Sequence, residues 1–276
     1  MKSRIVIVGA GPVGLEAALA ARHAGYEVEV LERGRLGSSM RDWGFVRMFS
    51  PFGMNASQLG RQRLAEQGIE LPRENELLTG HEFLDRYLEP LAALPELDGC
   101  LQTDCSVTGI ARQTLLKGDL IGDPRRAHDG FQLRIRSKGA EQSRVADIVL
   151  DCSGVWTHPN PAGSGGIPAL GERQILRTGD YRIPANDHAA RQAVEDSVLI
   201  IGAGYSAATS VLLLASDRSG SSRKSGRLFW RTRQIADQPL SRIPNDSLPE
   251  RDRIARQANE LRREAADPSN GNQAAS

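Results

Sequence analysis

The sequence predicts an α/β fold with two parallel-sheet units, a small antiparallel β ribbon, and a second unit that is incomplete. Two glycine-rich segments, Gly9-Ala10-Gly11-Pro12-Val13-Gly14 and Gly202-Ala203-Gly204-Tyr205-Ser206-Ala207, each follow a run of apolar residues. This pattern is typical of the strand-turn-helix start of a Rossmann-like unit. A chain of 276 residues also has room for about two domains of ~150 residues each. The two segments therefore predict paired dinucleotide-binding domains.

Each small residue of the first segment has a mechanical role. Gly9 permits the tight turn, Gly11 lets a pyrophosphate approach the bare backbone, and Gly14 lets the following helix pack close to the strand. Pro12 stands near the helix start, where its missing N–H group costs nothing. We assign these three glycines, Pro12 and Val13 to a cofactor site.

The elements around this segment follow in the order that a nucleotide-binding unit requires. A strand is predicted over 4–8, a helix over 13–24 that Gly25 ends, and a second strand over 27–31. Glu32 then stands about 20 residues past the glycines, where a carboxylate accepts both hydroxyls of an adenosine ribose. This acid favours a dinucleotide without a 2′-phosphate, either FAD or NAD, and we assign Arg33 to the same site. The alternative is a solvated carboxylate at a strand end.

The second segment is followed by basic residues instead of an acid. A strand is predicted over 197–201, a helix over 207–215 and another strand over 227–230. The chain then continues as Arg231-Thr232-Arg233, and a guanidinium at this position can bind a 2′-phosphate, which favours NADP over NAD. The alternative is a solvated basic loop, because the long loop 216–226 blurs the register.

Between the two segments the pattern changes several times. Residues 34–60 are rich in glycine and aromatic residues, which predicts an ordered loop that covers a flat ring, or else aromatic side chains that fill the core. A helix is expected from Thr79 onward, and 106–110 and 130–135 alternate like strands of an antiparallel ribbon. A further strand over 146–151 enters a tight turn of small residues.

Composition excludes several other classes of protein. Thirty-five basic and 34 acidic residues leave a net charge of +1, so no overall field attracts nucleic acid or an anionic membrane. The apolar stretch 198–215 fits strand-turn-helix better than a membrane span, and no secretory signal is recognisable, so we expect a cytoplasmic protein. Three scattered cysteines predict neither a disulfide framework nor a metal site, and we expect Cys100 and Cys105 to be inert.

The order of these motifs resembles a known family. An FAD-type segment, the turn Asp151-Cys152-Ser153-Gly154, the stretch Thr178-Gly179-Asp180-Tyr181-Arg182 and an NADP-type segment occur in sequence. In this order the chain resembles the class B flavin-dependent monooxygenases and the broader pyridine nucleotide-disulfide oxidoreductase-like superfamily, over roughly residues 3–235.

The resemblance implies roles for individual residues. Gly9, Gly11 and Gly14 would line the FAD pyrophosphate, Glu32 would bind its ribose, Val107 its adenine through the backbone, and Gly154 would form the crossing turn between domains. The NADPH site would comprise Gly202, Gly204, Ser206 and Ala207 at the pyrophosphate, with Arg231 and Arg233 at the 2′-phosphate. The resemblance identifies no catalytic residue.

Two departures from the family pattern weaken the assignment of oxygenation. The linker fingerprint before the second segment is reduced to a lone His188. After Arg233 the chain has prolines, a charged helix over 251–266 and a polar tail over 267–276 that reads as disordered, and further strands are missing. We therefore predict an FAD-binding domain over 1–157, a partial NAD(P)-binding domain over 158–240, and a helix with a polar tail over 241–276.

These motifs are compatible with three functions. The leading hypothesis is an NADPH-dependent FAD oxidoreductase, of monooxygenase type, acting on a small-molecule substrate. The second is a truncated FAD/NAD(P)-binding protein without turnover. The third is an NAD-dependent dehydrogenase that uses the first segment alone, although no Tyr-x-x-x-Lys pattern or His-carboxylate pair supports it. The sequence leaves a homo-oligomer open.

Overall fold

The computed structural model describes residues 2–176, 181–184, 197–220, 227–233 and 238–266. The chain divides into two compact units, Met1–Thr157 and His158–Ser276. Thr178–Asp180, His188 and the polar tail 267–276 lie outside the described residues. The predicted limits of the three domains stay predictions.

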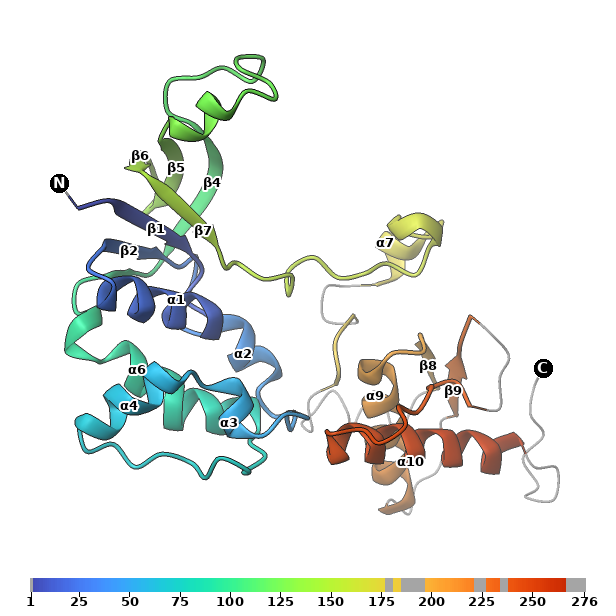
Figure 1. The fold of residues 1–276 in the computed structure, drawn as a ribbon. Coiled ribbons are helices and arrows are strands. Elements are labelled where there is room, and N and C mark those ends of the chain that lie inside the picture. Colours follow the sequence, from blue (N-terminus) through green and yellow to red (C-terminus); the bar gives the residue numbers. More distant parts are fainter. Residues whose placement is uncertain (1, 177–180, 185–196, 221–226, 234–237, 267–276) are drawn as a thin grey trace. The chain divides into compact units, whose positions relative to one another are not determined.

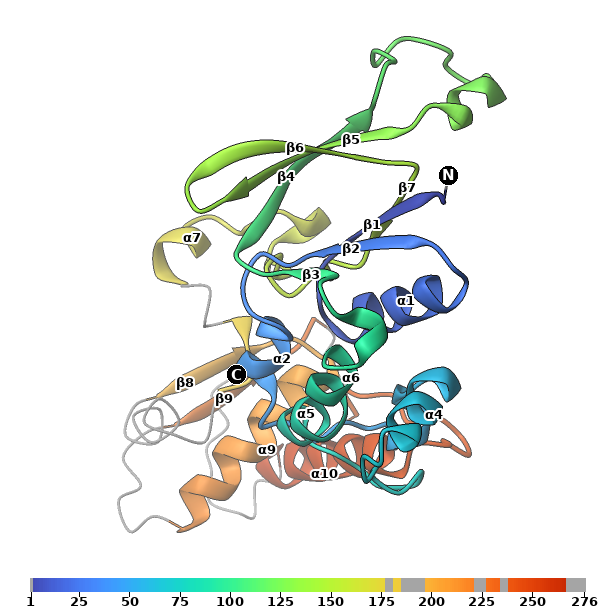
Figure 2. The same ribbon diagram turned by 90° about the vertical axis from the view of Figure 1, so that its left-hand side faces the viewer.

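The first unit is organised around a parallel sheet with the strand order β3-β2-β1-β7 (Figures 1 and 2). Its strands are β1 (Arg4–Val8), β2 (Glu27–Leu31), β3 (Leu101–Gln102) and β7 (Ile148–Asp151). Val6 and Ile7 are fully buried on opposite faces of β1, because both faces of this sheet are covered. The predicted α/β fold with a Rossmann-like parallel sheet is confirmed.

Helices cover one face of the sheet. Helix α1 (Pro12–His23) packs against β1 and β2, and it ends where Gly25 takes a φ of +88°, as the sequence predicts. The other helical elements of this unit are α2 (Ser38–Trp43), α3 (Phe52–Asn55), α4 (Gln58–Glu66), α5 (Gly80–Phe83), the π-helix η1 (Leu84–Leu88), α6 (Glu89–Ala92) and the short η2 (Pro95–Leu97). Thr79 and Glu82 form a capping box at the start of α5, which accounts for the helix predicted there.

A buried phenol links α1 to the helices behind it. Tyr87 is fully buried, and its hydroxyl donates to the carboxylate of Glu16, which also accepts the Ser57 N–H group at 3.0 Å. Burial raises the pKa of Tyr87, and the Glu16 carboxylate raises it further. A Cβ on Gly60 would lie 2.1 Å from the phenol oxygen, so this approach requires glycine.

An antiparallel sheet covers the other face of the parallel sheet (Figure 2). It consists of β4 (Cys105–Arg112), β5 (Phe131–Ser137) and β6 (Ala140–Ala146), with the short helix η3 (Pro124–His128) between β4 and β5. Val6 and Leu31 of the parallel sheet pack against Leu133 and Ile135 of β5. The Glu29 carboxylate on β2 binds Arg4 and also Arg144 on β6, at 2.6 and 3.1 Å, and so ties the two sheets together.

Residues 34–60 contain more regular structure than the sequence predicts. Helices α2 and α3 and the start of α4 lie here. They are too short to show a helical period, and turns at Gly37 and Ser57 begin two of them. Phe52 is buried, with its ring centroid 5.3 Å from that of Tyr87, so this aromatic residue fills the core.

The second unit contains a shorter parallel pair, β8 (Val198–Ile201) and β9 (Leu228–Arg231). Helix α9 (Tyr205–Gly220) packs against both strands, and α10 (Pro249–Ala266) packs against α9. Asn259 of α10 exchanges two hydrogen bonds with the backbone of Leu240, which fixes the chain ahead of this helix. On the strands, Leu199, Ile201 and Phe229 are exposed.

The loop that opens the second unit closes around a buried carboxylate. It contains η4 (Ser164–Gly166) and α7 (Glu172–Ile175). Glu172 accepts the N–H groups of Ala162 and Ala169 at 2.9 and 2.6 Å, and the hydroxyl of Tyr181 at 2.7 Å. These donors hold the pKa of the Glu172 carboxyl below its ordinary value, with the backbone N–H groups as the main cause.

Acid is therefore expected to loosen this loop. Because the folded-state pKa is lowered, the stabilisation by Glu172 is complete above its ordinary value of 4.5 and is lost as pH falls through the folded-state value. Glu172→Gln should lower the melting temperature at pH 7, and this difference from the unmodified protein should shrink below pH 4.5. Thermal melts followed by circular dichroism, between neutral and acidic pH, measure this difference in melting temperature. Glu70→Gln at an exposed position is the control, and a difference independent of pH would contradict the assignment.

Candidate functional site

The first glycine turn joins β1 to α1 at the carboxyl edge of the parallel sheet. Gly9 takes a φ of +101°, and its N–H group donates to the Leu31 carbonyl at 2.8 Å. A Cβ on Gly9 would lie 2.7 Å from the Cys152 carbonyl oxygen, and one on Gly14 would lie 1.9 Å from the Gly9 carbonyl oxygen. Both positions thus require glycine for packing within the protein.

Gly11 stands in a different environment. A Cβ there would meet no atom within 4 Å, so the space beside this residue is open. Gly11 is also the N-cap of α1, and no side chain caps the helix end. With Pro12 at the first helical position and Val13 70% exposed, the first N–H groups of α1 remain available to an anion such as pyrophosphate.

Glu32 is held in place at the end of β2. Its two carboxylate oxygens accept the N–H groups of Ala10 and Gly34 at 2.8 and 2.9 Å. A carboxylate has about four acceptor positions, so each oxygen retains capacity for a ribose hydroxyl. Arg33, the next residue, is exposed beside it. The first glycine turn is therefore joined by a direct hydrogen bond to Glu32, the predicted ribose-binding residue.

The structure also brings Val107 and Gly154 near this turn. Strand β4 begins beside Glu32, because the Cys105 N–H group donates to the Glu32 carbonyl at 2.9 Å, and Val107 follows two residues later at a β-bulge. Gly154 has a φ of +68° and comes directly after Cys152 and Ser153, which lie against Gly9. Asp151 accepts the hydroxyl of Ser153 at 2.6 Å, and this bond lowers the pKa of the Asp151 carboxyl and fixes the turn.

The second glycine turn has a similar backbone arrangement. Gly202 has a φ of +134°, its N–H group donates to the Arg231 carbonyl at 2.9 Å, and a Cβ on Gly204 would again meet no atom within 4 Å. Ala207 stands where the first turn has Gly14, and its side chain would lie 3.7 Å from a Cβ on Gly202, which is an ordinary contact. Ser206 is exposed in the first turn of α9.

Strand register identifies a residue that the sequence pattern missed. Val8 pairs with Leu31 before the first turn, and Ile201 pairs with Arg231 before the second. Thr232 therefore occupies the position of Glu32, and Arg233 that of Arg33. Arg231 corresponds to Leu31, one residue earlier. Counting from the strand pairing reveals this residue. The loop predicted over 216–226 is wrong in its first part, because α9 continues to Gly220.

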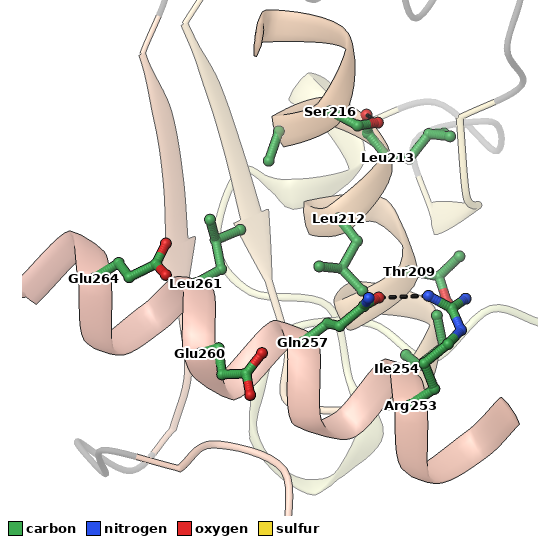
Figure 3. Close-up of a pocket in the computed structure, with 11 residues that line it drawn as sticks. Thr209, Leu212, Leu213, Ser216, Arg253, Ile254, Gln257, Glu260, Leu261 and Glu264 are labelled. Atoms are coloured by element: carbon green, nitrogen blue, oxygen red, sulfur yellow. Dashed lines mark hydrogen bonds between the residues drawn. The ribbon is translucent and has the colours of Figure 1, made fainter. Parts of the chain in front are cut away.

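The second unit also has a groove of about 600 Å³ between α9 and α10 (Figure 3). Leu212, Leu213 and Leu261 supply its apolar lining, and Glu260 and Glu264 stand on the α10 side. The guanidinium of Arg253 donates to Gln257 and is paired with Glu250. Acidic side chains disfavour a dinucleotide phosphate here, so the groove is distinct from the glycine turn at the start of α9.

The remaining titratable and thiol groups in the part of the chain that the structure describes form no further reactive centre. No group of three His, Cys, Asp or Glu side chains there could hold a metal ion. Cys100 and Cys105 are buried and form no disulfide, and burial raises the pKa of both thiols. Within the same residues, no helix has the length and apolar character needed to cross a membrane.

Comparison with known proteins agrees with this geometry. Residues 6–116 match the family model described as pyridine nucleotide-disulphide oxidoreductase. The predicted resemblance to pyridine nucleotide-disulfide oxidoreductase-like proteins is confirmed for these residues. They include the last three residues of β1, all of α1 and β2, and Glu32, and thus the whole of the first glycine turn and the predicted ribose-binding carboxylate.

Individual relatives are more distant. A D-amino-acid oxidase from Rubrobacter xylanophilus is 29% identical over 198 residues, which cover 63% of this chain and 59% of that protein. The bacillithiol disulfide reductase Bdr from Bacillus cereus has a TM-score of 0.60 and 18% identity, covering 94% of this chain and 66% of the reductase. The structure of OTEMO in complex with FAD and NADP gives a TM-score of 0.55 at 14% identity, covering 95% of this chain and 45% of OTEMO. The structural likeness establishes the fold, and the chain spans less than two thirds of the length of each of these proteins.

The glycine turn gives a test with a matched pair of variants. Gly14→Ala should destabilise the protein by about 3 kcal/mol, although alanine favours helices, because its methyl group would clash with rigid backbone. Gly11→Ala should leave the melting temperature nearly unchanged and weaken FAD binding, because its methyl group would enter the open space. Calorimetry and flavin titration measure the two effects. Equal loss of stability in both variants would contradict the assignment.

Proposed function

We propose that this protein is an FAD-dependent oxidoreductase that receives hydride from NADPH, of the flavin monooxygenase type. The observation that carries the proposal is Glu32, bonded to the Ala10 N–H group of the first turn and retaining acceptor capacity beside an open Gly11. A carboxylate that can bind ribose and a turn that can bind phosphate thus lie side by side in one unit, as a dinucleotide with an unmodified adenosine ribose requires.

The residues of the first unit fit FAD. The N–H groups at the start of α1 would hold its pyrophosphate, Glu32 and Arg33 its ribose, and the backbone near Val107 its adenine. When bound, FAD supplies the redox chemistry by accepting a hydride and passing electrons onward. The chain's own contribution is to orient the dinucleotide and to exclude water from it.

The second unit fits a dinucleotide with a 2′-phosphate. Gly202, Gly204, Ser206 and Ala207 would hold the pyrophosphate of NADPH. At the ribose end the residue in the place of Glu32 is Thr232, which carries no negative charge, and Arg231 and Arg233 flank it. A hydroxyl and a guanidinium at this point favour a phosphate over a bare ribose.

Oxygenation of a small molecule, rather than reduction of a disulfide, is the finer part of the proposal. Cys100 and Cys105 are buried with raised thiol pKa values, which is the opposite of the environment that a reactive thiolate needs. A dithiol centre built on this pair is therefore disfavoured. The cytoplasmic location and the oligomeric state stay predictions.

The absorption spectrum of the purified full chain tests the function. After addition of FAD and removal of free flavin, the protein should be yellow, and anaerobic NADPH should bleach it. Air should then restore the colour, with NADPH consumption stimulated by soft nucleophilic substrates. A colourless protein would contradict flavin binding. Reduction by a D-amino acid but not by NADPH would instead indicate an oxidase of the kind found in Rubrobacter xylanophilus.

Coenzyme preference tests the second unit. Thr232→Glu should reverse the preference from NADPH to NADH, because a carboxylate there accepts ribose hydroxyls and repels a 2′-phosphate. Arg233→Ala should weaken NADPH binding about tenfold, equivalent to about 1.4 kcal/mol, with little change for NADH. Titrations of both coenzymes measure this. Arg227→Ala, an exposed arginine at the opposite end of β9, is the control, and the register would be wrong if Arg231→Ala alone lost the preference.

A further inference from the structure

Near the end of the first unit, an indole ring is held by a hydrogen bond to a carboxylate that is distant in the sequence. The Trp156 indole N–H group donates to Oδ2 of Asp42 at 3.0 Å, across 114 positions of sequence. Asp42 lies in α2, and Gly37, the N-cap of that helix, donates its N–H group to the Ala10 carbonyl at 3.1 Å. Trp156 is half-buried and follows Ser153, which lies against Gly9. Ring and carboxylate are thus both connected to the first glycine turn through short stretches of chain.

Strand order gives the direction in which a dinucleotide would extend. In the order β3-β2-β1-β7, Glu32 follows the end of β2 and the glycine turn follows β1. Strand β7 lies on the opposite side of β1, with Asp151 paired to Val8 (Figures 1 and 2). A dinucleotide with its adenosine ribose at Glu32 and its pyrophosphate at Gly11 therefore continues over the end of β7. The chain that follows β7 leads from this end of the strand to Trp156.

We propose that Trp156, oriented by Asp42, forms an aromatic wall against the isoalloxazine half of FAD. This inference rests on the proposed function and assigns the flavin side of the same site. A planar indole favours stacked or edge contacts with another ring, and a hydrogen bond at its one polar atom fixes the orientation of the ring. Asp42 is a positioning residue, because it acts through the indole.

The other two tryptophans serve as internal controls. Trp43 packs over Gly80, where a Cβ would lie 2.6 Å from its ring. Trp230 belongs to the second unit, and its indole N–H group donates to the Gly202 carbonyl at 2.8 Å. Neither of these residues lies on the chain that leaves β7, whereas Trp156 follows the end of that strand by five residues.

Flavin fluorescence provides a readout that is independent of turnover. An indole in contact with an isoalloxazine quenches its emission by reversible electron transfer in the excited state. In the FAD-loaded full chain, Trp156→Phe should raise the flavin emission several-fold and remove the shortest lifetime. Trp43→Phe and Trp230→Phe should leave both unchanged. A purely structural role for Trp156 would alter the melting temperature without altering these lifetimes.

A second pair of variants tests the positioning by Asp42 while Trp156 is retained. Asp42→Asn keeps an acceptor oxygen for the indole and should preserve the quenching, whereas Asp42→Ala should release the ring and broaden the lifetimes. A yellow protein whose emission is the same in Trp156→Phe, and in Asp42→Ala, would overturn the inference alone. A chain that stays colourless with FAD would contradict the proposed function as well, so the two failures are distinguishable.

Discussion

The contact between the Gly9 carbonyl and Gly14 is the constraint on which the first unit depends. It sets how closely α1 approaches the end of β1, because a Cβ on Gly14 would lie 1.9 Å from that oxygen. The same turn presses Gly9 against Cys152 and Ser153, so the position of β7 depends on it too. With α1 seated, its exposed N–H groups point out of the sheet edge at the place where Glu32 arrives from β2. Phosphate binding and core packing are therefore consequences of a single close approach.

The second turn shares the hydrogen bond of the first but not its third glycine. Its hydrogen bond to the following strand is retained, since Gly202 bonds to Arg231 as Gly9 bonds to Leu31. Ala207 takes the place of the third glycine, and its side chain would make only an ordinary contact, at 3.7 Å, with a Cβ on Gly202. Fewer elements surround it among the described residues, where the sheet consists of β8 and β9 and several apolar side chains on the strands are exposed. The sequence motif thus specifies the turn, but the packing around it depends on the rest of the unit.

The features predictable from sequence are those with a local cause. Gly9, Gly14 and Gly25 adopt the conformations that their motifs require, and Thr79 caps its helix, because each depends on a few neighbouring residues. The equivalence of Thr232 with Glu32 was not predictable in this way, since it is defined by pairing between β8 and β9, which lie far apart in the sequence. The same holds for the bond from Tyr87 to Glu16 and for that from Trp156 to Asp42. Both join residues that only the folded topology brings together.

The two ribose positions differ in how far they are organised before a ligand arrives. Glu32 is already bonded to the N–H groups of Ala10 and Gly34, so its rotamer is fixed and little conformational entropy remains to be lost on binding. Arg231 and Arg233 are exposed, and long side chains of this kind lose rotamer freedom when they close on a phosphate. A preorganised acid suits a cofactor that stays bound, and exposed cations suit a coenzyme that exchanges in every cycle. This asymmetry is the one that the proposed transfer from NADPH to FAD requires.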